Sequence, residues 1–355
     1  MVQTKGDRSG PPLRPLDDGS KVTATESAAE TRRHAAVVYN PIKARLDPIR
    51  SAVIDQERAN GWDRTRWYET SSADSGRSAA AQALGEQPAV VVVVGGDGTV
   101  RAIAEVMHGT GIPVALLPAG TGNLLARELS TPLNDVAACI AAAFTGDDRG
   151  IDVGTADLED ETGTRSTHAF VVMAGIGLDA DMAQHTSAIA KKHLGWLAYV
   201  TSIARSIIRN RLFHLNYRID DERVSSTRAH TVIVGNCGTL TGNLLLLPAA
   251  VIDDGLLDVV MMRPEGAFGW ARIGTRLTLQ GIARQSRVTG SMMRRTPDLL
   301  SLAYVQGRQF EARFDTPHVI ELDGDSFGHV TRVRMSLHPG ALLVRVAPQA
   351  FRRRE

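Results

Sequence analysis

Two glycine-rich stretches in the first half of the chain have the composition of anion-binding loops. GGDGT at 95–99 directly follows five consecutive valines, and PAGTGN at 118–123 ends the apolar run that begins at Ile112. Glycines between a buried strand and a helix allow backbone N–H groups to approach phosphate oxygens. GGDGTV matches neither GxGxxG nor GxxxxGK followed by Ser or Thr, so the spacing alone does not identify the anion.

The carboxylate of Asp97 is unexpected inside the first loop. A carboxylate repels a polyphosphate unless a divalent cation lies between them, or unless it takes a proton from an attacking hydroxyl. Both alternatives indicate phosphoryl transfer. An isolated GGDG sequence is equally compatible with a plain turn, in which Asp and Gly satisfy the backbone geometry.

The elements that carry these loops have the pattern of an α/β domain. From His34 to about residue 150 the pattern predicts strand, strand, helix, strand, helix, strand and helix in turn. Unbroken valines are typical of a parallel strand covered by helices on both faces. The ends of successive parallel strands meet at the crevice where α/β folds bind ligands, which favours a site over a turn. Asn40 and Pro41 end the first predicted strand, and Thr70 ends the second.

Beyond residue 150 the pattern becomes β-rich. Short strand patterns without regular helices between them, among them QFEARF, HVIELDG, VRMSLH and ALLVRV, predict an antiparallel β-sandwich over residues 151–348. Helical insertions at about 186–210 and 265–285 interrupt it. The expected fold is therefore an N-terminal α/β parallel-sheet nucleotide-binding domain, residues 34–150, followed by an all-β domain. Residues 1–33 have the Gly, Pro, Ser and charge content of a disordered tail.

The composition excludes several classes of protein. Lys and Arg number 40 against 39 Asp and Glu, so no global charge attracts nucleic acid, and no helix-turn-helix or basic-aromatic pattern suggests it. No apolar run reaches the length of a membrane span, and residues 1–33 contain no apolar h-region, so a secretory signal is not expected. The two cysteines form no disulfide framework, so a cytoplasmic location is expected. Neither cysteine belongs to a metal motif and no HExxH is present, so zinc catalysis is not expected.

Taken together, several separate motifs resemble the soluble bacterial diacylglycerol kinases, relatives of the sphingosine and ceramide kinases. The resemblance covers about residues 34–348, and it is greatest to actinobacterial members, whose variant of the second loop is PAGTGNLLAR. The motifs occur in the family's order: GGDGT (95–99), PAGTGNLLAR (118–127), IDVG (151–154), AGIGLDADM (174–182), DDGLLDVV (253–260) and LDGD (322–325).

The resemblance implies a lipid kinase that uses ATP and Mg²⁺ to convert diacylglycerol into phosphatidic acid. It places ATP between the two domains, in contact with residues that end the strands or form the loops. These nucleotide-binding candidates are Asn40, Pro41, Thr70, Gly95, Gly96, Asp97, Gly98, Thr99, Gly120, Thr121 and Asn123.

The same resemblance implies the catalytic and metal-binding residues. Asp325 occupies the position of the family's catalytic base, usually Glu, and Asp97 would act beside it by facing the Mg²⁺ of the nucleotide. The alternative for Asp325 is a plain Asp-Gly hairpin turn. A structural Mg²⁺ would be bound by Asp254 and the main-chain oxygens of Val251 and Leu256, with Asp152 in the network that links this ion to the active site.

Departures from the family pattern keep other functions open. After GGDGTV the family often continues with Asn-Glu, whereas this chain has Arg101 and Ala102, and Leu124 replaces an Asp of the second loop. Kinases of sphingoid bases or other lipids, an NAD kinase, and a catalytically silent nucleotide- or lipid-binding protein remain alternatives.

Access to a lipid substrate requires peripheral contact with a membrane surface. We expect the insertion at 186–210 to make this contact through Lys191, Lys192 and Trp196. Helical spacing of its apolar residues also fits a helix with one buried face. The oligomeric state is left open by the sequence, with a homodimer as one alternative.

Overall fold

The structure, a computed structural model, describes residues 33–177, 212–238, 247, 249–263 and 302–348. The predicted disordered tail, apart from Arg33, lies outside these ranges, as do the predicted helical insertions. Lys191, Lys192 and Trp196, the residues expected at a membrane surface, are likewise outside the described residues.

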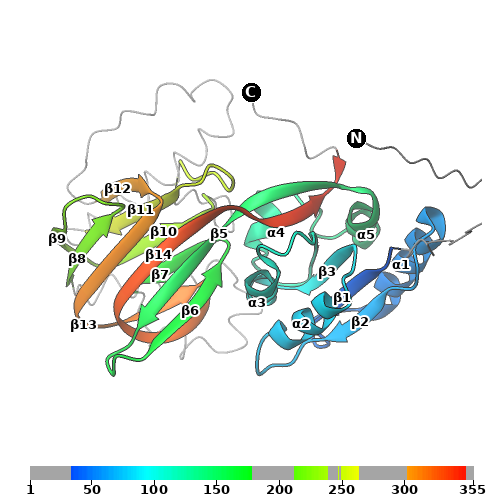
Figure 1. The fold of residues 1–355 in the computed structure, drawn as a ribbon, viewed down its shortest axis with the longest axis horizontal. Coiled ribbons are helices and arrows are strands. Elements are labelled where there is room, and N and C mark those ends of the chain that lie inside the picture. The colour runs from blue at the N-terminus through cyan, green and yellow to red at the C-terminus, as the bar shows by residue number, and fades with distance from the viewer. Residues whose placement is uncertain (1–32, 178–211, 239–246, 248, 264–301, 349–355) are drawn as a thin grey trace, which may run out of the picture. The chain divides into compact units, whose positions relative to one another are not determined.

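The N-terminal half is an α/β structure built on four parallel strands in the order β2-β1-β3-β4 (Figure 1). All six residues of β3 are buried, as the unbroken valines predict. In chain order the elements are β1 (Ala35–Tyr39), α1 (Leu46–Asn60), β2 (Arg66–Glu69), α2 (Arg77–Gly85), β3 (Val90–Gly95), α3 (Asp97–Met107), β4 (Val114–Pro118), α4 (Leu124–Glu128) and α5 (Val136–Thr145).

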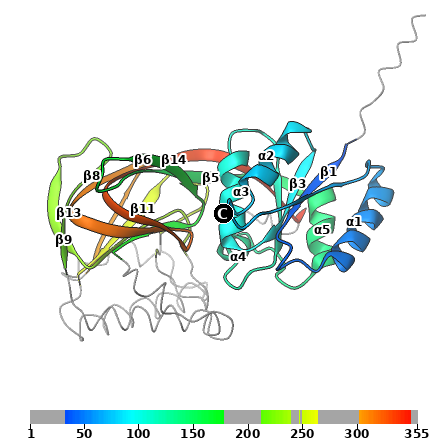
Figure 2. The ribbon, with the colours of Figure 1, turned by 90° about the horizontal axis from the view of Figure 1, so that it is seen from below.

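Helices cover both faces of this sheet, which is why β3 requires apolar residues at every position (Figure 2). On one face, Val92 packs in a core with residues of α1 and α5, including Ile49 and Ile140. On the other face, Val91 lies in a core with residues of α2, α3 and α4, including Ile103. Alternate valines of one strand therefore supply two separate cores.

The C-terminal half is all-β and encloses a third core. Its most buried large side chains include Phe170, Phe310, Leu215 and Met261. The predicted α/β domain followed by a β-sandwich is confirmed. The strands are β5 (Asp147–Glu159), β6 (Arg165–Phe170), β7 (Met173–Ile176), β8 (Phe213–Ile219), β9 (Ser225–Ala229), β10 (Thr231–Gly235), β11 (Leu257–Met262), β12 (Leu302–Gly307), β13 (Gln309–Leu322) and β14 (Asp325–Val346).

Strand β13 contributes to both layers of the sandwich. Its first residues pair with β8 and its last residues pair with β7, while β14 pairs along much of its length. The register breaks between Arg313 and His318, in a segment that contains Pro317, which has no N–H to donate. Two strands that the sequence pattern predicted separately, QFEARF and HVIEL, are thus one bent strand.

Strands β5 and β14 continue from the sandwich into the α/β half. The last residues of β14 pair in parallel with β4, at Val344 and Arg345, and antiparallel with β5. The boundary expected at residue 150 therefore falls inside β5, which begins at Asp147. VRMSLH and ALLVRV, expected as two strands, form one strand with an irregular register between His338 and Leu342. In the described residues no helix is long and apolar enough to cross a membrane.

Gly154 of β5 lies directly opposite Phe170 of β6, and its missing side chain makes room for the phenyl ring. We expect Gly154→Ala to lower the free energy of unfolding by about 1–3 kcal/mol, because a β-carbon there would collide with the fully buried ring. Urea denaturation measures this. Gly85→Ala, in α2 with open space at the β-carbon, is the control and should leave stability unchanged or slightly higher; equal losses would contradict the packing explanation.

Candidate functional site

The two glycine-rich loops lie in direct contact, as their positions at neighbouring strand ends predict. The first joins β3 to α3 and the second joins β4 to α4. A β-carbon added to Gly120 would lie 2.6 Å from the Cα of Gly96, so side chains would separate the two backbones. The absence of side chains therefore produces a continuous surface of backbone groups next to the start of α3.

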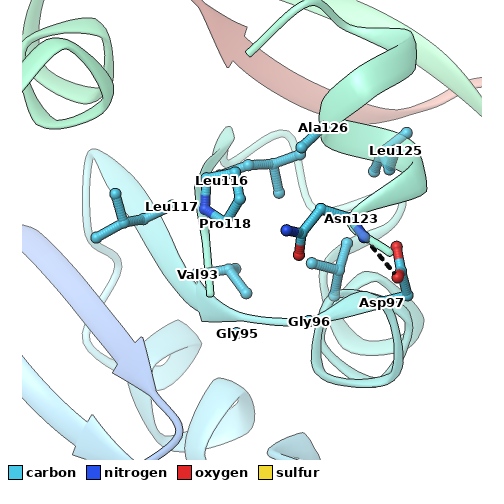
Figure 3. A pocket seen from close by; sticks show the side chains of 11 residues that line it. Val93, Gly95, Gly96, Asp97, Leu116, Leu117, Pro118, Asn123, Leu125 and Ala126 are labelled. Atoms are coloured by element: carbon cyan, nitrogen blue, oxygen red, sulfur yellow. Dashed lines mark hydrogen bonds between the residues drawn. The ribbon is translucent and has the colours of Figure 1, made fainter. Parts of the chain in front are cut away.

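Asp97 holds the second loop against the first. Its Oδ2 accepts a hydrogen bond from the N–H of Asn123 at 2.8 Å (Figure 3), and its Oδ1 accepts one from the N–H of Leu124 at 2.6 Å. Burial raises the pKa of Asp97, and these backbone hydrogen bonds oppose that effect. Both carboxylate oxygens thus bind the N-terminus of α4. Contact of Asp97 with a nucleotide-bound cation, and its predicted catalytic role, stay predictions.

The second loop is closed by Asn123, which adopts a left-handed conformation with φ of 49°. Its Oδ1 accepts from the N–H of Gly120 and its Nδ2 donates to the carbonyl of the same residue. Thr121 is exposed on this loop. A small cavity beneath the loops is lined mainly by apolar side chains, among them Val93, Leu116 and Leu125 (Figure 3). An anion would therefore contact the outer side of the loops.

The remaining nucleotide candidates lie at the strand ends as predicted. Asn40 donates its N–H to the carbonyl of Val94 at the end of β3, and its Oδ1 accepts from the N–H groups of Ile42 and Lys43. Pro41 is exposed in the same turn. This turn directs Lys43 toward the loops: its Nζ lies 3.4 Å from the position of a β-carbon on Gly96.

Two of the predicted residues, Thr70 and Thr99, are buried threonines that pack against glycines. Thr99, in the first turn of α3, packs against Gly95, where a β-carbon would lie 2.6 Å from the Cβ of Thr99. Thr70 packs against Gly76 in a similar way and donates its N–H to the carbonyl of Tyr39. The structure places both among the supports of the loops.

Asp325 comes to the first glycine loop from the other half of the chain. It follows the tight turn formed by Asp323 and Gly324, with φ of 49° and 86°, and begins β14. Its Oδ2 lies 2.7 Å from the position that a β-carbon on Gly98 would occupy. The hairpin turn is present, and it brings Asp325 next to the loop. The role of Asp325 as catalytic base stays a prediction.

Arg101 is the partner of Asp325 that the sequence did not identify. Its Nη2 donates to Oδ2 of Asp325 at 3.1 Å, and its guanidinium carbon lies 4.7 Å from the ring centroid of Phe327. Its only signal in the sequence is a charged residue within the apolar pattern of α3. Lys43 was also missed, although it lies three residues after Asn40, in the turn that follows the first strand.

Asp323 anchors the turn that presents Asp325. It is buried, and its carboxylate accepts hydrogen bonds from the N–H groups of Val171, Val172 and Met173 at 2.8–2.9 Å. Burial raises its pKa to about 6, against the opposing effect of these three hydrogen bonds. The turn is therefore attached to the start of β7 through one side chain.

The predicted metal loop, residues 251–256, is held by Asp152. The buried carboxylate of Asp152 accepts from the N–H of Gly255 at 2.7 Å and from the N–H of Gly340 at 2.8 Å. Asp254 lies next to Gly255 and accepts from the N–H of Leu256. The four predicted metal residues, Asp152, Val251, Asp254 and Leu256, are thus brought together around one loop.

The charges around this loop fit a divalent cation. Burial raises the pKa of Asp254, and the neighbouring carboxylates of Asp152 and Asp253 raise it further. A cation would relieve this repulsion, and carboxylate and carbonyl oxygens are suitable ligands for Mg²⁺. In the described part of the chain no cluster of three or more His, Cys, Asp or Glu side chains is arranged around a metal position, so most ligands would be main-chain oxygens and water.

Comparison with protein-family models gives two matches. Residues 34–156 match the diacylglycerol kinase catalytic domain, and residues 171–346 match the YegS C-terminal NAD kinase beta sandwich-like domain. The two matched segments correspond to the α/β half and the β-sandwich half of the structure, and the first includes both glycine-rich loops.

Individual proteins are similar over most of the chain. A Mycobacterium tuberculosis diacylglycerol kinase is 28% identical over 247 residues, 67% of this chain and 77% of its own. A Pseudomonas fluorescens protein named as a probable YegS-like lipid kinase is 30% identical over 250 residues, 67% of this chain and 76% of its own. An uncharacterized Synechocystis protein is 25% identical, and the match spans 57% of its length.

A solved structure has the same fold. The crystal structure of a Bacillus anthracis diacylglycerol kinase superposes with a TM-score of 0.63 at 19% identity and covers 90% of this chain and 99% of its own.

We expect Asp97→Asn to lower the free energy of unfolding by about 1–3 kcal/mol, because one backbone N–H would face an amide nitrogen instead of an acceptor oxygen. Thermal or urea denaturation measures the loss. Asp135→Asn is the matched control, since Asp135 accepts from a single N–H at the start of α5 and Asn caps a helix equally well. Equal effects of the two substitutions would contradict the proposed role of Asp97 as a bridge.

The stability contributed by Asp323 should fall as the pH rises from about 4 to 7. Its pKa of about 6 in the folded state exceeds the ordinary value of 3.8, so over this window the folded state binds more protons than the unfolded state. Asp323→Asn removes this titration. The advantage of the wild type over Asp323→Asn in urea denaturation should therefore be larger at pH 4 than at pH 7, and a constant or growing advantage would contradict the assignment.

Proposed function

The chain belongs to the family of diacylglycerol kinases and YegS-like lipid kinases. We propose that this lipid kinase transfers the γ-phosphoryl group of ATP to the hydroxyl of diacylglycerol. One observation carries this proposal. The Asp325 carboxylate, on a hairpin of the β-sandwich, lies within van der Waals distance of the position of a Gly98 β-carbon, at the start of α3. A proton acceptor and an anion-binding loop are thereby adjacent.

The backbone of the two loops is suited to bind the phosphates of ATP. A helix N-terminus favours negative charge, and the backbones of Gly96 and Gly120 approach each other closely at the start of α3. The ammonium group of Lys43, 3.4 Å from the position of a β-carbon on Gly96, adds positive charge beside the loops. When bound, ATP supplies the phosphoryl group, and Mg²⁺ neutralises charge on its oxygens.

Asp325 has the position and chemistry of a general base. Its Oδ2 is held by Arg101, and the side chain remains 44% exposed, so a substrate hydroxyl can reach the other oxygen. In the proposed step Asp325 accepts the proton of the lipid hydroxyl as the hydroxyl oxygen bonds to the γ-phosphorus, and the bond to the departing ADP oxygen breaks. Positioning and charge neutralisation would supply most of the rate acceleration.

The loop at 251–256 is suited to a structural role for Mg²⁺. Asp254 and the main-chain oxygens of Val251 and Leu256 would be its ligands, and Asp152 would orient the loop through its hydrogen bond to Gly255. This loop is contributed by the sandwich half, so a cation here would stabilise the domain that carries Asp325.

The acceptor lipid and the membrane contact are part of the proposal. Diacylglycerol is favoured by the name of the mycobacterial relative, whereas the pseudomonad relative is named only as a lipid kinase. Since diacylglycerol resides in bilayers, catalysis requires transient contact of the protein with a membrane surface. A panel of diacylglycerol, monoacylglycerol, ceramide and sphingosine distinguishes the lipids, and NAD tests the alternative acceptor.

We expect purified protein to transfer ³²P from γ-labelled ATP to diacylglycerol in mixed micelles, and Asp325→Asn to lower kcat by about 100-fold or more, as the loss of a general base does. Asp221→Asn, on the exposed turn after β8, is the matched control and should retain full activity. Equal labelling by Asp325→Asn and the wild type would exclude Asp325 as the base. Labelling of another lipid alone would correct the substrate, and labelling of none would contradict the proposed function.

A further inference from the structure

Arg101 is a buried cation held by three neighbours. Its side chain is 5% exposed, its Nη1 lies 3.5 Å from Oε2 of Glu105, and its Nη2 donates to Oδ2 of Asp325 at 3.1 Å. The ring of Phe327, two residues after Asp325, covers the guanidinium. The guanidinium therefore has a defined position beside the residue proposed as the base.

Glu105 does not depend on Arg101 for its hydrogen bonds. Its Oε1 lies 2.9 Å from Nε of Arg77, and its Oε2 accepts from Nη2 of Arg77 at 3.0 Å and from the N–H of Ala169 at 3.2 Å. Asp325 differs, because over the described ranges Arg101 is the one group that donates to its carboxylate. Arg101 therefore connects α3 to Asp325 and orients the Asp325 carboxylate.

The two residues are among the departures from the family pattern noted in the sequence. Arg101 stands where Asn is common, and Asp325 stands where Glu is common, 224 positions apart in the chain. In the structure they touch. Asp carries its carboxylate one methylene closer to its own backbone than Glu does. Arg is much longer than Asn, so Arg101 spans the extra distance to the carboxylate of Asp325.

On the basis of the proposed function, we propose that Arg101 is the positioning residue for Asp325 and that the two side chains form a matched pair. Arg101 binds Oδ2 and leaves Oδ1 without a donor in the described residues, while both oxygens lie against the first turn of α3, 2.7 Å (Oδ2) and 3.0 Å (Oδ1) from the position of a β-carbon on Gly98. A base that rotates freely would spend less time in the geometry required for proton transfer, and small displacements of reacting groups reduce rates strongly.

A cycle of four proteins tests this pairing: wild type, Arg101→Asn, Asp325→Glu and the double variant, each assayed for kcat and KM with ATP and the lipid. Each single substitution should lower kcat by about 10- to 100-fold with the KM for ATP changed by less than about 3-fold. The double variant should recover most of the lost kcat, because Glu reaches without help from Arg. Arg334→Asn, at an exposed arginine of β14, is the matched control and should retain wild-type kinetics.

Each outcome of the cycle has one meaning. Single effects that simply multiply in the double variant, or an unaffected Arg101→Asn, would overturn the matched pair. Thermal denaturation monitors folding. If Arg101→Asn does not fold, Arg101→Lys replaces it, since Lys keeps the charge without the planar guanidinium, and this variant should lower kcat less than about 10-fold. A larger loss of kcat that Asp325→Glu still restores would also support the pairing. If the wild type labels no lipid, the proposed function fails and the pairing fails with it, whereas an active wild type with an indifferent Arg101→Asn contradicts the pairing alone.

Discussion

Backbone hydrogen bonding along β14 is the constraint on which the rest of the structure depends. The strand begins at Asp325, pairs with β13 inside the sandwich, and ends beside β4 and β5 in the α/β half. Without β14, β4 would present unpaired N–H and C=O groups at the edge of the parallel sheet. Because one strand closes this edge and also carries Asp325, the two halves of the chain are held in the register that brings the carboxylate to the glycine loop.

Three carboxylates, those of buried Asp152 and Asp323 and of half-buried Asp97, hold the loops around the site in the same way. Asp97 accepts two backbone N–H groups of the second glycine loop, Asp152 accepts those of Gly255 and Gly340, and Asp323 accepts three at the start of β7. A buried carboxylate requires such donors, and loops with few other hydrogen-bond partners gain a fixed shape from them. Asp325, with one cationic donor and partial exposure, is different in kind and is suited to chemistry.

This division of roles changes the meaning of the acid inside the first glycine loop. A carboxylate in a phosphate-binding loop suggests contact with a cation, and that contact stays a prediction for Asp97. Its geometry adds a second function, because the two loops can approach closely only if the start of α4 is held in place. Repulsion of bound phosphate is reduced when the carboxylate points into the protein and is hydrogen bonded there.

Much of the fold follows from local pattern, and the failures have local causes. The valine run predicts β3 and its burial on both faces, and the β-rich second half predicts the sandwich. Helix α1 was not anticipated because only Ile49 and Val53 of its fifteen residues are buried, which leaves a weak apolar pattern. The long strands β13 and β14 were divided in two because Pro317 and the Pro-Gly pair at 339–340 resemble turns, although tertiary pairing carries the strands past them.

The sequence by itself determined the two glycine loops, the strand ends that carry them and the carboxylates available near them, because these depend on neighbouring residues and on apolar periodicity. Only the tertiary structure decided which of these carboxylates support loops, that Asp325 remains partly exposed, and that Arg101 contacts it. The reason is physical: a hydrogen bond between residues 224 positions apart depends on the register of β14 against β4 and β13, and no local pattern encodes that register.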